Sequence, residues 1–177
     1  MSFEERIPVT IVRPPTVFGP RDADVLGVFR SAQFRLAPCL AGPDRLVSMI
    51  YVEDLAEGIL RAALSPLAQG QIYFLANAAP VVWREFALEV ARILGYRAVC
   101  LPIPLAVGKA MALTGDLISK VSNANPVFRS EKFEEMKQLA WVCSTEKATK
   151  ELSWQPSTPL EEAVKTTAAW YRKHGWM

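Results

Sequence analysis

An unbroken apolar run near the start of the chain constrains the fold most. Residues 8–12 read Pro-Val-Thr-Ile-Val, and Arg13 followed by the pair Pro14-Pro15 ends the run. A β-branched run without polar alternation is typical of a strand that is covered on both faces, as in a parallel sheet. The run therefore predicts a central strand of such a sheet.

Strand-like and helix-like segments alternate over the rest of the chain. Further strands are predicted at 46–52, 71–76 and 98–101, with a brief extended piece at 141–143. Helices are predicted over 25–36, 83–94, 104–121, 130–139, 145–152 and 160–173, with one more from Asp54, and turns at 18–22 and 122–126. About four short strands among helices indicate an α/β or α+β domain.

The helix expected from Asp54 has a clear start signal. Asp54 is a good N-cap residue, and Glu57 stands where a capping box places its acid. Arg13 ends an apolar strand, where an unpaired guanidinium would be costly, so it needs a carboxylate or backbone partner. We expect Asp54 to cap its helix and to form a structural ion pair with Arg13.

Length and charge exclude several classes of protein. The chain has 177 residues, enough for one ordinary domain, and a net charge of +2 with acids and bases scattered. No nucleic-acid partner is predicted from this pattern. The acidic residues near Met1 argue against a signal peptide, and segment 101–113 is too short and too interrupted for a transmembrane span.

The cysteines give no sign of a metal or redox site. Cys39, Cys100 and Cys143 are odd in number and far apart, so we expect reduced, mostly buried thiols in a cytoplasmic protein. The tryptophans expected to anchor the core are Trp141, Trp154 and Trp170.

Four blocks of sequence carry a family resemblance. They are residues 9–21, 50–56, 72–77 and 144–156, and a last helical segment follows at 160–171. In this order the blocks resemble the extended short-chain dehydrogenase/reductases, the NAD-dependent epimerase/dehydratase superfamily. The resemblance implies an α/β fold: the C-terminal part of a Rossmann-like NAD(P)-binding fold with its small α+β substrate-binding region, the N-terminal nucleotide-binding half being absent.

The same resemblance divides the chain and limits its chemistry. Residues 1–22 would form the last part of the Rossmann sheet with the nicotinamide loop, and 23–177 the substrate-binding region of one C-terminal domain. The family's glycine-rich loop is missing, and no tyrosine of the chain has a lysine four residues on. No catalytic residue is therefore predicted. The complete protein would use NAD or NADP, whereas this chain alone, a fragment if Met1 is not the natural start, should bind neither and be inactive.

The resemblance also implies site residues. The backbone of Pro14, Pro15, Thr16 and Val17 would border the nicotinamide, although these residues also serve simply to turn the chain. On the substrate side the expected residues are Arg21 and Tyr51. An arginine after a turn is equally typical of a solvated surface.

A departure from the family pattern favours one branch. Nucleotide-sugar members carry a phosphate-binding arginine where this chain has Val47, with Arg45 two positions upstream. The sequence is closer to the 3β-hydroxysteroid dehydrogenase-like branch, which acts on apolar or sterol-like alcohols and ketones. The alternatives are a nucleotide-sugar epimerase or dehydratase, for which Arg45 would serve after a register shift, and a non-catalytic binding module completed by another chain.

Two apolar features of the chain predict further contacts. A parallel strand without its neighbours exposes an apolar edge, which predicts a homo-oligomer or a swapped dimer of the chain. The apolar segment 101–121 is predicted to be a buried helix, with a lid over a lipophilic substrate and an interfacial membrane helix as alternatives.

Overall fold

The computed structural model describes residues 9–121 and 128–177, so the turn predicted at 122–126 lies outside the described residues. The strands are β1 (Ile11–Arg13), β2 (Thr16–Phe18), β3 (Leu36–Leu40), β4 (Leu46–Val47), β5 (Met49–Tyr51), β6 (Ile72–Phe74), β7 (Val81–Val82), β8 (Val99–Ile103) and β9 (Ala140–Trp141). The helices are α1 (Leu26–Gln33), α2 (Val52–Leu64), α3 (Trp83–Ile93), α4 (Leu105–Val121), α5 (Ser130–Met136), α6 (Glu146–Leu152) and α7 (Leu160–Lys173), with a short 3-10 turn at Pro66–Ala68. The fold is α/β, as predicted.

The strands form several small sheets rather than one large one. Parallel pairs join β1 with β6, β2 with β5 and β3 with β8, and a mixed sheet has the order β7-β4-β9. Strands β2 and β7 were not predicted, because they are only two or three residues long and too short to show a period, and the five-residue β3 was not predicted because its Pro38 interrupts the pattern of a strand. The strand predicted at 46–52 is divided at Ser48, so that β4 and β5 belong to different sheets.

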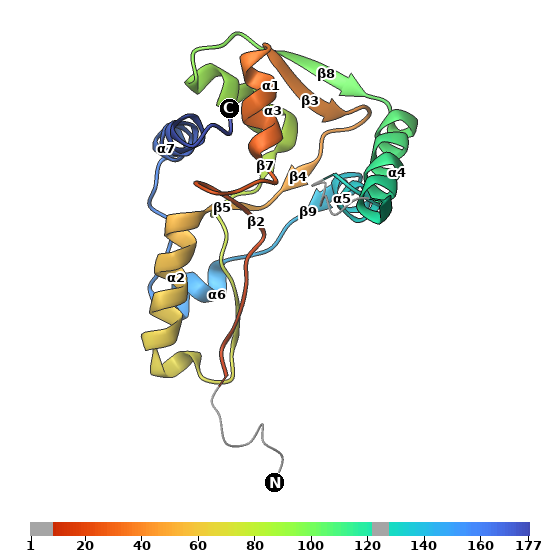
Figure 1. Ribbon diagram of the computed structural model, residues 1–177. Coiled ribbons are helices and arrows are strands. Elements are labelled where there is room, and N and C mark those ends of the chain that lie inside the picture. The colour runs from red at the N-terminus through yellow and green to blue at the C-terminus, as the bar shows by residue number, and fades with distance from the viewer. Residues whose placement is uncertain (1–8, 122–127) are drawn as a thin grey trace.

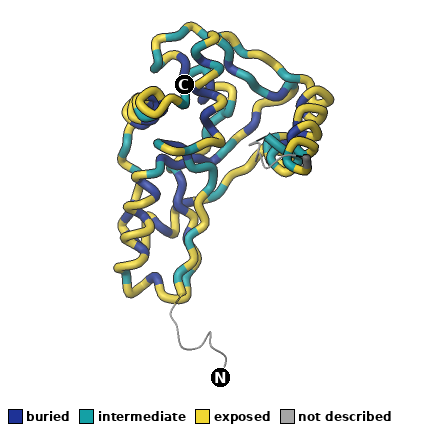
Figure 2. Tube along the Cα trace, viewed as in Figure 1, coloured by how far each residue is buried: buried dark blue, intermediate teal, exposed yellow. Residues whose placement is uncertain are grey.

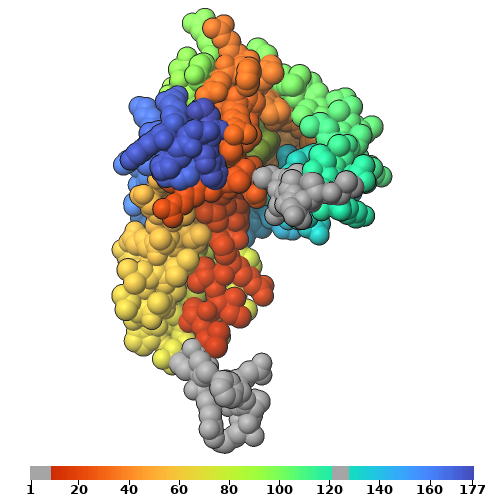
Figure 3. Space-filling model, in the orientation of Figure 1, coloured from red at the N-terminus to blue at the C-terminus, as the bar shows by residue number. Residues whose placement is uncertain are grey.

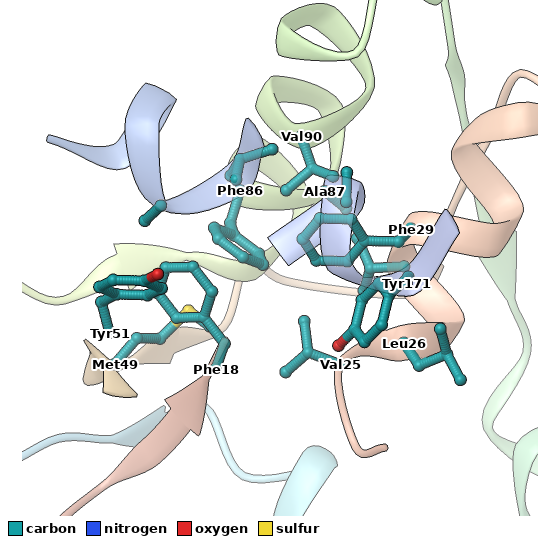
Figure 4. Close-up of a cluster of buried hydrophobic side chains, with 14 of the residues drawn as sticks. Phe18, Val25, Leu26, Phe29, Met49, Tyr51, Phe86, Ala87, Val90 and Tyr171 are labelled. Carbon is teal, nitrogen blue, oxygen red and sulfur yellow. The ribbon is translucent and has the colours of Figure 1, made fainter. Parts of the chain in front are cut away.

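Two hydrophobic clusters hold most of the chain together. The larger lies between α1, α3 and α7 and the β2–β5 pair, and its aromatic rings include Phe18, Phe29, Phe86 and Tyr171 (Figure 4). The smaller packs α2 and α6 against the β1–β6 pair (Figure 1). At its centre lies Trp154, which is fully buried as predicted. The two clusters lie at opposite ends of the molecule, and the β2–β5 pair lies between them.

Strand β1 is not covered on both faces within this chain, which corrects the prediction of a central strand. Val12 faces the cluster under α2, whereas Ile11 and its partner Ile72 on β6 point the other way and remain 43% and 39% exposed. The opposite side of the β1–β6 pair carries no other element of residues 9–121 and 128–177 (Figure 2). A parallel pair with one bare apolar face normally has further layers.

Asp54 does not cap its helix, because α2 begins at Val52 and Tyr51 is its N-cap residue. The buried Asp54 carboxylate instead accepts hydrogen bonds from the backbone N–H groups of Ser157 and Thr158, at 3.0 and 3.2 Å, and from the Thr158 hydroxyl at 3.0 Å. The expected ion pair with Arg13 is therefore wrong. Asp54 instead links the segment before α7 to the first turn of α2. Arg13 is exposed.

Two of the three cysteines are not free thiols. Cys39 on β3 and Cys100 on β8 form a disulfide, and Cys143 is free and half-buried. The two strands are parallel neighbours although 61 residues separate the cysteines, a proximity that spacing in the sequence does not reveal. The prediction of reduced thiols is thus wrong for Cys39 and Cys100, and the argument for a cytoplasmic location that used it loses this support.

Helix α4 is not the buried helix that was expected. Among residues 105–120 of α4, only Gly108, Ala112 and Gly115 are buried, and the larger apolar residues are exposed. Most of the α4 trace is therefore coloured as exposed in Figure 2. Trp141, predicted to anchor the core, is 50% exposed. None of the helices among the described residues is long and apolar enough to cross a bilayer.

Candidate functional site

A cavity of about 410 Å³ opens at the carboxyl end of β1, where parallel sheets place ligands. The turn Pro14-Pro15 follows β1 and leads directly into β2, so that the whole predicted nicotinamide loop, Pro14 to Val17, lines one wall. The remaining walls come from the turn after β2, with Asp22 and Asp24, and from a distant part of the chain, with Lys132, Glu135 and Trp141.

Lys132 closes the cavity opposite the loop. Its ammonium group lies 3.0 Å from an Asp24 carboxylate oxygen and 3.5 Å from Glu135, which is one turn further along α5. Burial lowers the pKa of Lys132, but the hydrogen bond and charge of Asp24, with Glu135, outweigh burial and raise that pKa above its ordinary value. The ammonium therefore stays charged and links α5 to the loop after β2.

Asp22 shapes the turn beneath the cavity. Its carboxylate accepts the backbone N–H groups of Asp24 and Val25, at 3.0 and 2.9 Å, and its backbone carbonyl accepts the Tyr171 hydroxyl at 2.6 Å. Burial raises the pKa of Asp22 in spite of the two N–H donors. The turn is thus anchored to α7, and it begins at Gly19, where a side chain would collide with the Val52 side chain at 2.4 Å.

A second, apolar cavity of about 330 Å³ adjoins the first. The two share Pro14, Pro15 and Trp141, and the second is completed by Phe74 and the segment 140–143. Ser48, buried between β4 and β5, holds this segment: its hydroxyl oxygen accepts the Cys143 N–H at 3.1 Å. The loop after β1 therefore separates a charged compartment from an apolar one, and Trp141 belongs to both.

The two residues expected on the substrate side lie away from both cavities. Arg21 is exposed in the turn after β2 and adopts a left-handed backbone conformation, with φ of 73°. Tyr51 is only 3% exposed and packs beside Phe18 and Met49 in the larger cluster (Figure 4). Burial and neighbouring acids raise the pKa of Tyr51, so its phenol stays protonated. Contact of either residue with a substrate stays a prediction.

Arg45, the alternative candidate for the phosphate-binding arginine of nucleotide-sugar enzymes, makes structural hydrogen bonds to a turn. It is 9% exposed, and its guanidinium donates to the backbone carbonyls of Leu40 and Pro43, both at 3.0 Å, and to that of Ala41 at 3.4 Å. Since the carbonyl groups of the 40–43 turn already take these donors, an anionic ligand would have to displace them.

The charged wall residues escaped the sequence analysis. Asp24, Lys132 and Glu135 carry no spacing signal, because more than a hundred residues separate Asp24 from Lys132, and Trp141 was expected in the core rather than at a site. Only the docking of α5 against the turn after β2 brings them together.

Comparison with known proteins gives the family. Residues 4–105 match the 3-beta hydroxysteroid dehydrogenase/isomerase family. The chain is 30% identical to "Ceramide reductase" of Caulobacter vibrioides, covering 94% of this chain and 52% of that protein, and 26% identical to human "Short-chain dehydrogenase/reductase family 42E member 1", covering 93% and 44%. It thus spans about half the length of these curated relatives.

Among solved structures, the UDP-glucuronic acid 4-epimerase of Bacillus cereus, solved with UDP-glucuronic acid and NAD, superimposes with a TM-score of 0.66 at 14% identity. The match covers 95% of this chain and 46% of that one, and it shows the fold. Since the family match extends over more than half of the 177 residues, the chain belongs to the 3-beta hydroxysteroid dehydrogenase/isomerase family of extended short-chain dehydrogenase/reductases and corresponds to the C-terminal part of its members.

Proposed function

We propose that this chain is the substrate-side part of an NAD(P)-dependent oxidoreductase that interconverts an alcohol and a ketone on an apolar or sterol-like substrate. The observation that carries the proposal is the position of Pro14 to Val17, which line the cavity at the carboxyl end of β1. Their backbone would border the nicotinamide of NAD or NADP. The whole of 1–177 acts as one C-terminal domain, with 1–22 completing the Rossmann sheet.

The charge of the larger cavity favours a neutral substrate. Three acidic residues, Asp22, Asp24 and Glu135, line this cavity together with a single basic residue, Lys132. A diphosphate entering this compartment would meet like charges, which costs affinity. Arg45 offers no compensation, because it holds the 40–43 turn. This arrangement disfavours the nucleotide-sugar alternative, and the apolar second cavity suits a hydrocarbon or ring system.

The uncovered face and edge of the β1–β6 pair support the proposal that a nucleotide-binding half packs there in the complete protein. Ile11 and Ile72 remain 43% and 39% exposed on a parallel pair that would normally be covered. A nucleotide-binding half would complete the sheet here and supply the catalytic groups, either from the same polypeptide or, in the binding-module alternative, from another chain. Without it, two copies of this chain are expected to pair through the same edge, and neither NAD binding nor turnover is expected.

The test joins this chain to the nucleotide-binding half of the Caulobacter vibrioides relative. It measures oxidation of NADH and NADPH with sterol-like ketones and, because epimerisation and dehydration consume no net NADH, conversion of UDP-sugars in the presence of NAD by chromatography of the products. We expect turnover of the apolar ketones only. Thr16→Trp, which fills the larger cavity, is expected to abolish it, whereas Gln69→Trp at an exposed site remote from both cavities leaves it unchanged. Turnover of UDP-sugars, or micromolar NADH binding to the 177-residue chain by calorimetry, would overturn the proposal.

A further inference from the structure

Trp141 is the one exposed tryptophan of this chain, whose tryptophans all lie within residues 9–121 and 128–177. Half of its surface is accessible, whereas Trp154 is fully buried and the others are half-buried. The large indole ring of an exposed tryptophan gains nothing from burial until another group covers it. Because this ring also lines a cavity, a ligand is the group that would cover it.

The backbone that carries Trp141 is fixed, although the ring is exposed. Strand β9 pairs with β4, with Trp141 opposite Val47, and the Trp141 carbonyl accepts the Ser48 N–H at 2.9 Å. Two residues further on, the Ser48 hydroxyl oxygen accepts the Cys143 N–H at 3.1 Å. A ring on such a backbone can contact a ligand at little cost in conformational freedom, since the segment is already ordered.

Trp141 contributes to both cavities, and so do Pro14 and Pro15 of the proposed nicotinamide loop. The segment that contains β9 passes beside the segment of β1 and β2 (Figure 1, Figure 3). A ketone that reacts at this loop would therefore have its carbonyl group at the junction of the two cavities. Its two substituents would extend into different cavities, of about 410 and 330 Å³.

The two cavities differ in the groups that they offer to a substituent. In the larger, the Lys132 ammonium lies between the carboxylates of Asp24 and Glu135, so that a hydroxyl group can both accept and donate a hydrogen bond there. The smaller has an apolar lining that includes Phe74 and Val142, which suits a hydrocarbon. A ketone with one hydroxyl-bearing and one hydrocarbon substituent thus has one favoured orientation.

We propose that Trp141 is the specificity-determining residue of this site: its ring separates the two cavities and fixes which face of an unsymmetrical ketone is reduced. This inference rests on the proposed oxidoreductase function. Bound NADH or NADPH supplies hydride to the carbonyl carbon and is oxidised, while the carbonyl oxygen takes up a proton, so that the ketone becomes a secondary alcohol. Exchanging the two substituents between the cavities presents the opposite face of the carbonyl and gives the opposite enantiomer.

The first test measures binding to the 177-residue chain without cofactor. The probe is the neutral naphthyl ketone prodan, whose emission shifts to shorter wavelength in an apolar site. Trp141→Ala should weaken probe binding by more than about tenfold, and Trp141→Phe, which keeps an aromatic ring, by less than about threefold. The matched control is Leu139→Ala, an exposed apolar residue of the same segment that lines neither cavity, and it should leave binding unchanged. Circular dichroism verifies that each variant is folded.

The second test uses the joined protein with an unsymmetrical ketone that carries one hydroxyl-terminated and one plain alkyl chain, and chiral chromatography separates the alcohols. The wild type should form one enantiomer in more than about 20-fold excess, and Trp141→Ala should reduce that excess below about threefold, whereas Leu139→Ala keeps it. Equal probe binding by the wild type and Trp141→Ala, or equal enantiomer ratios, would overturn the inference while the proposed function stands. Absence of turnover with any ketone would count against the proposed function, and weaker probe binding by Trp141→Ala would then still assign Trp141 to a ligand site.

Discussion

Asp54 offers the sharpest test of how this fold is held together. Its carboxylate is 4% exposed and accepts three hydrogen bonds from Ser157 and Thr158, more than 100 residues away. A hydrogen bond to a charged group contributes about 1.5–3 kcal/mol to stability. Here all three hydrogen bonds share one oxygen, Oδ1 of Asp54, and the exposed Ser157 N–H can bind water when the carboxylate is removed, so the total is smaller than three times that value. We therefore expect Asp54→Ala to lower the free energy of unfolding by about 2–4 kcal/mol.

For a chain of this length, that loss corresponds to a fall in Tm of roughly 5–15 °C. Urea unfolding followed by circular dichroism measures the difference. Asp54→Asn, which keeps one neutral acceptor, should lose about half as much, and Glu53→Ala, at an exposed neighbour, less than about 1 kcal/mol. If Asp54→Ala unfolds within about 0.5 kcal/mol of the wild type, the carboxylate does not hold the segment before α7, and it would be available to a ligand.

Three further predictions concern packing, cross-linking and pH. Gly58→Ala should destabilise the protein by about 1–2 kcal/mol, because its Cβ would lie 2.9 Å from the Trp154 ring, whereas Gly27→Ala, with open space around it, should stabilise by up to about 1 kcal/mol; urea unfolding compares them. Cys39→Ser removes the cross-link between β3 and β8 and should cost about 2–4 kcal/mol, and thiol titration of the unfolded wild type should find one free cysteine rather than three. Because the pKa of Lys132 is raised above 10.5 in the folded protein, its contribution is complete below pH 10.5 and is lost as pH rises through the folded pKa; Lys132→Met should abolish that part of the alkaline loss of stability, measured between about pH 10 and about pH 12.

The local features of the chain were predictable from its sequence. Helix α3 follows the predicted range closely, because Trp83, Phe86 and Val90 repeat at helical spacing and Gly95 ends it with φ of 84°. The turn after β1 was predicted in the same way, since Pro14-Pro15 must turn the chain after a strand. The family resemblance rested on such contiguous blocks, and the family match at residues 4–105 confirms it.

What joins distant segments was decided by the tertiary structure. Lys132 meets Asp24, Cys39 meets Cys100, and Asp54 meets Thr158 only because helices and parallel strands pack across long separations. Sequence periodicity reports which face of an element is apolar, and it cannot report which element covers that face. The burial of small residues on α4 and the exposure of its leucines are of this kind: the sequence determined a long apolar helix, and packing against α5 determined which side of it stays outside.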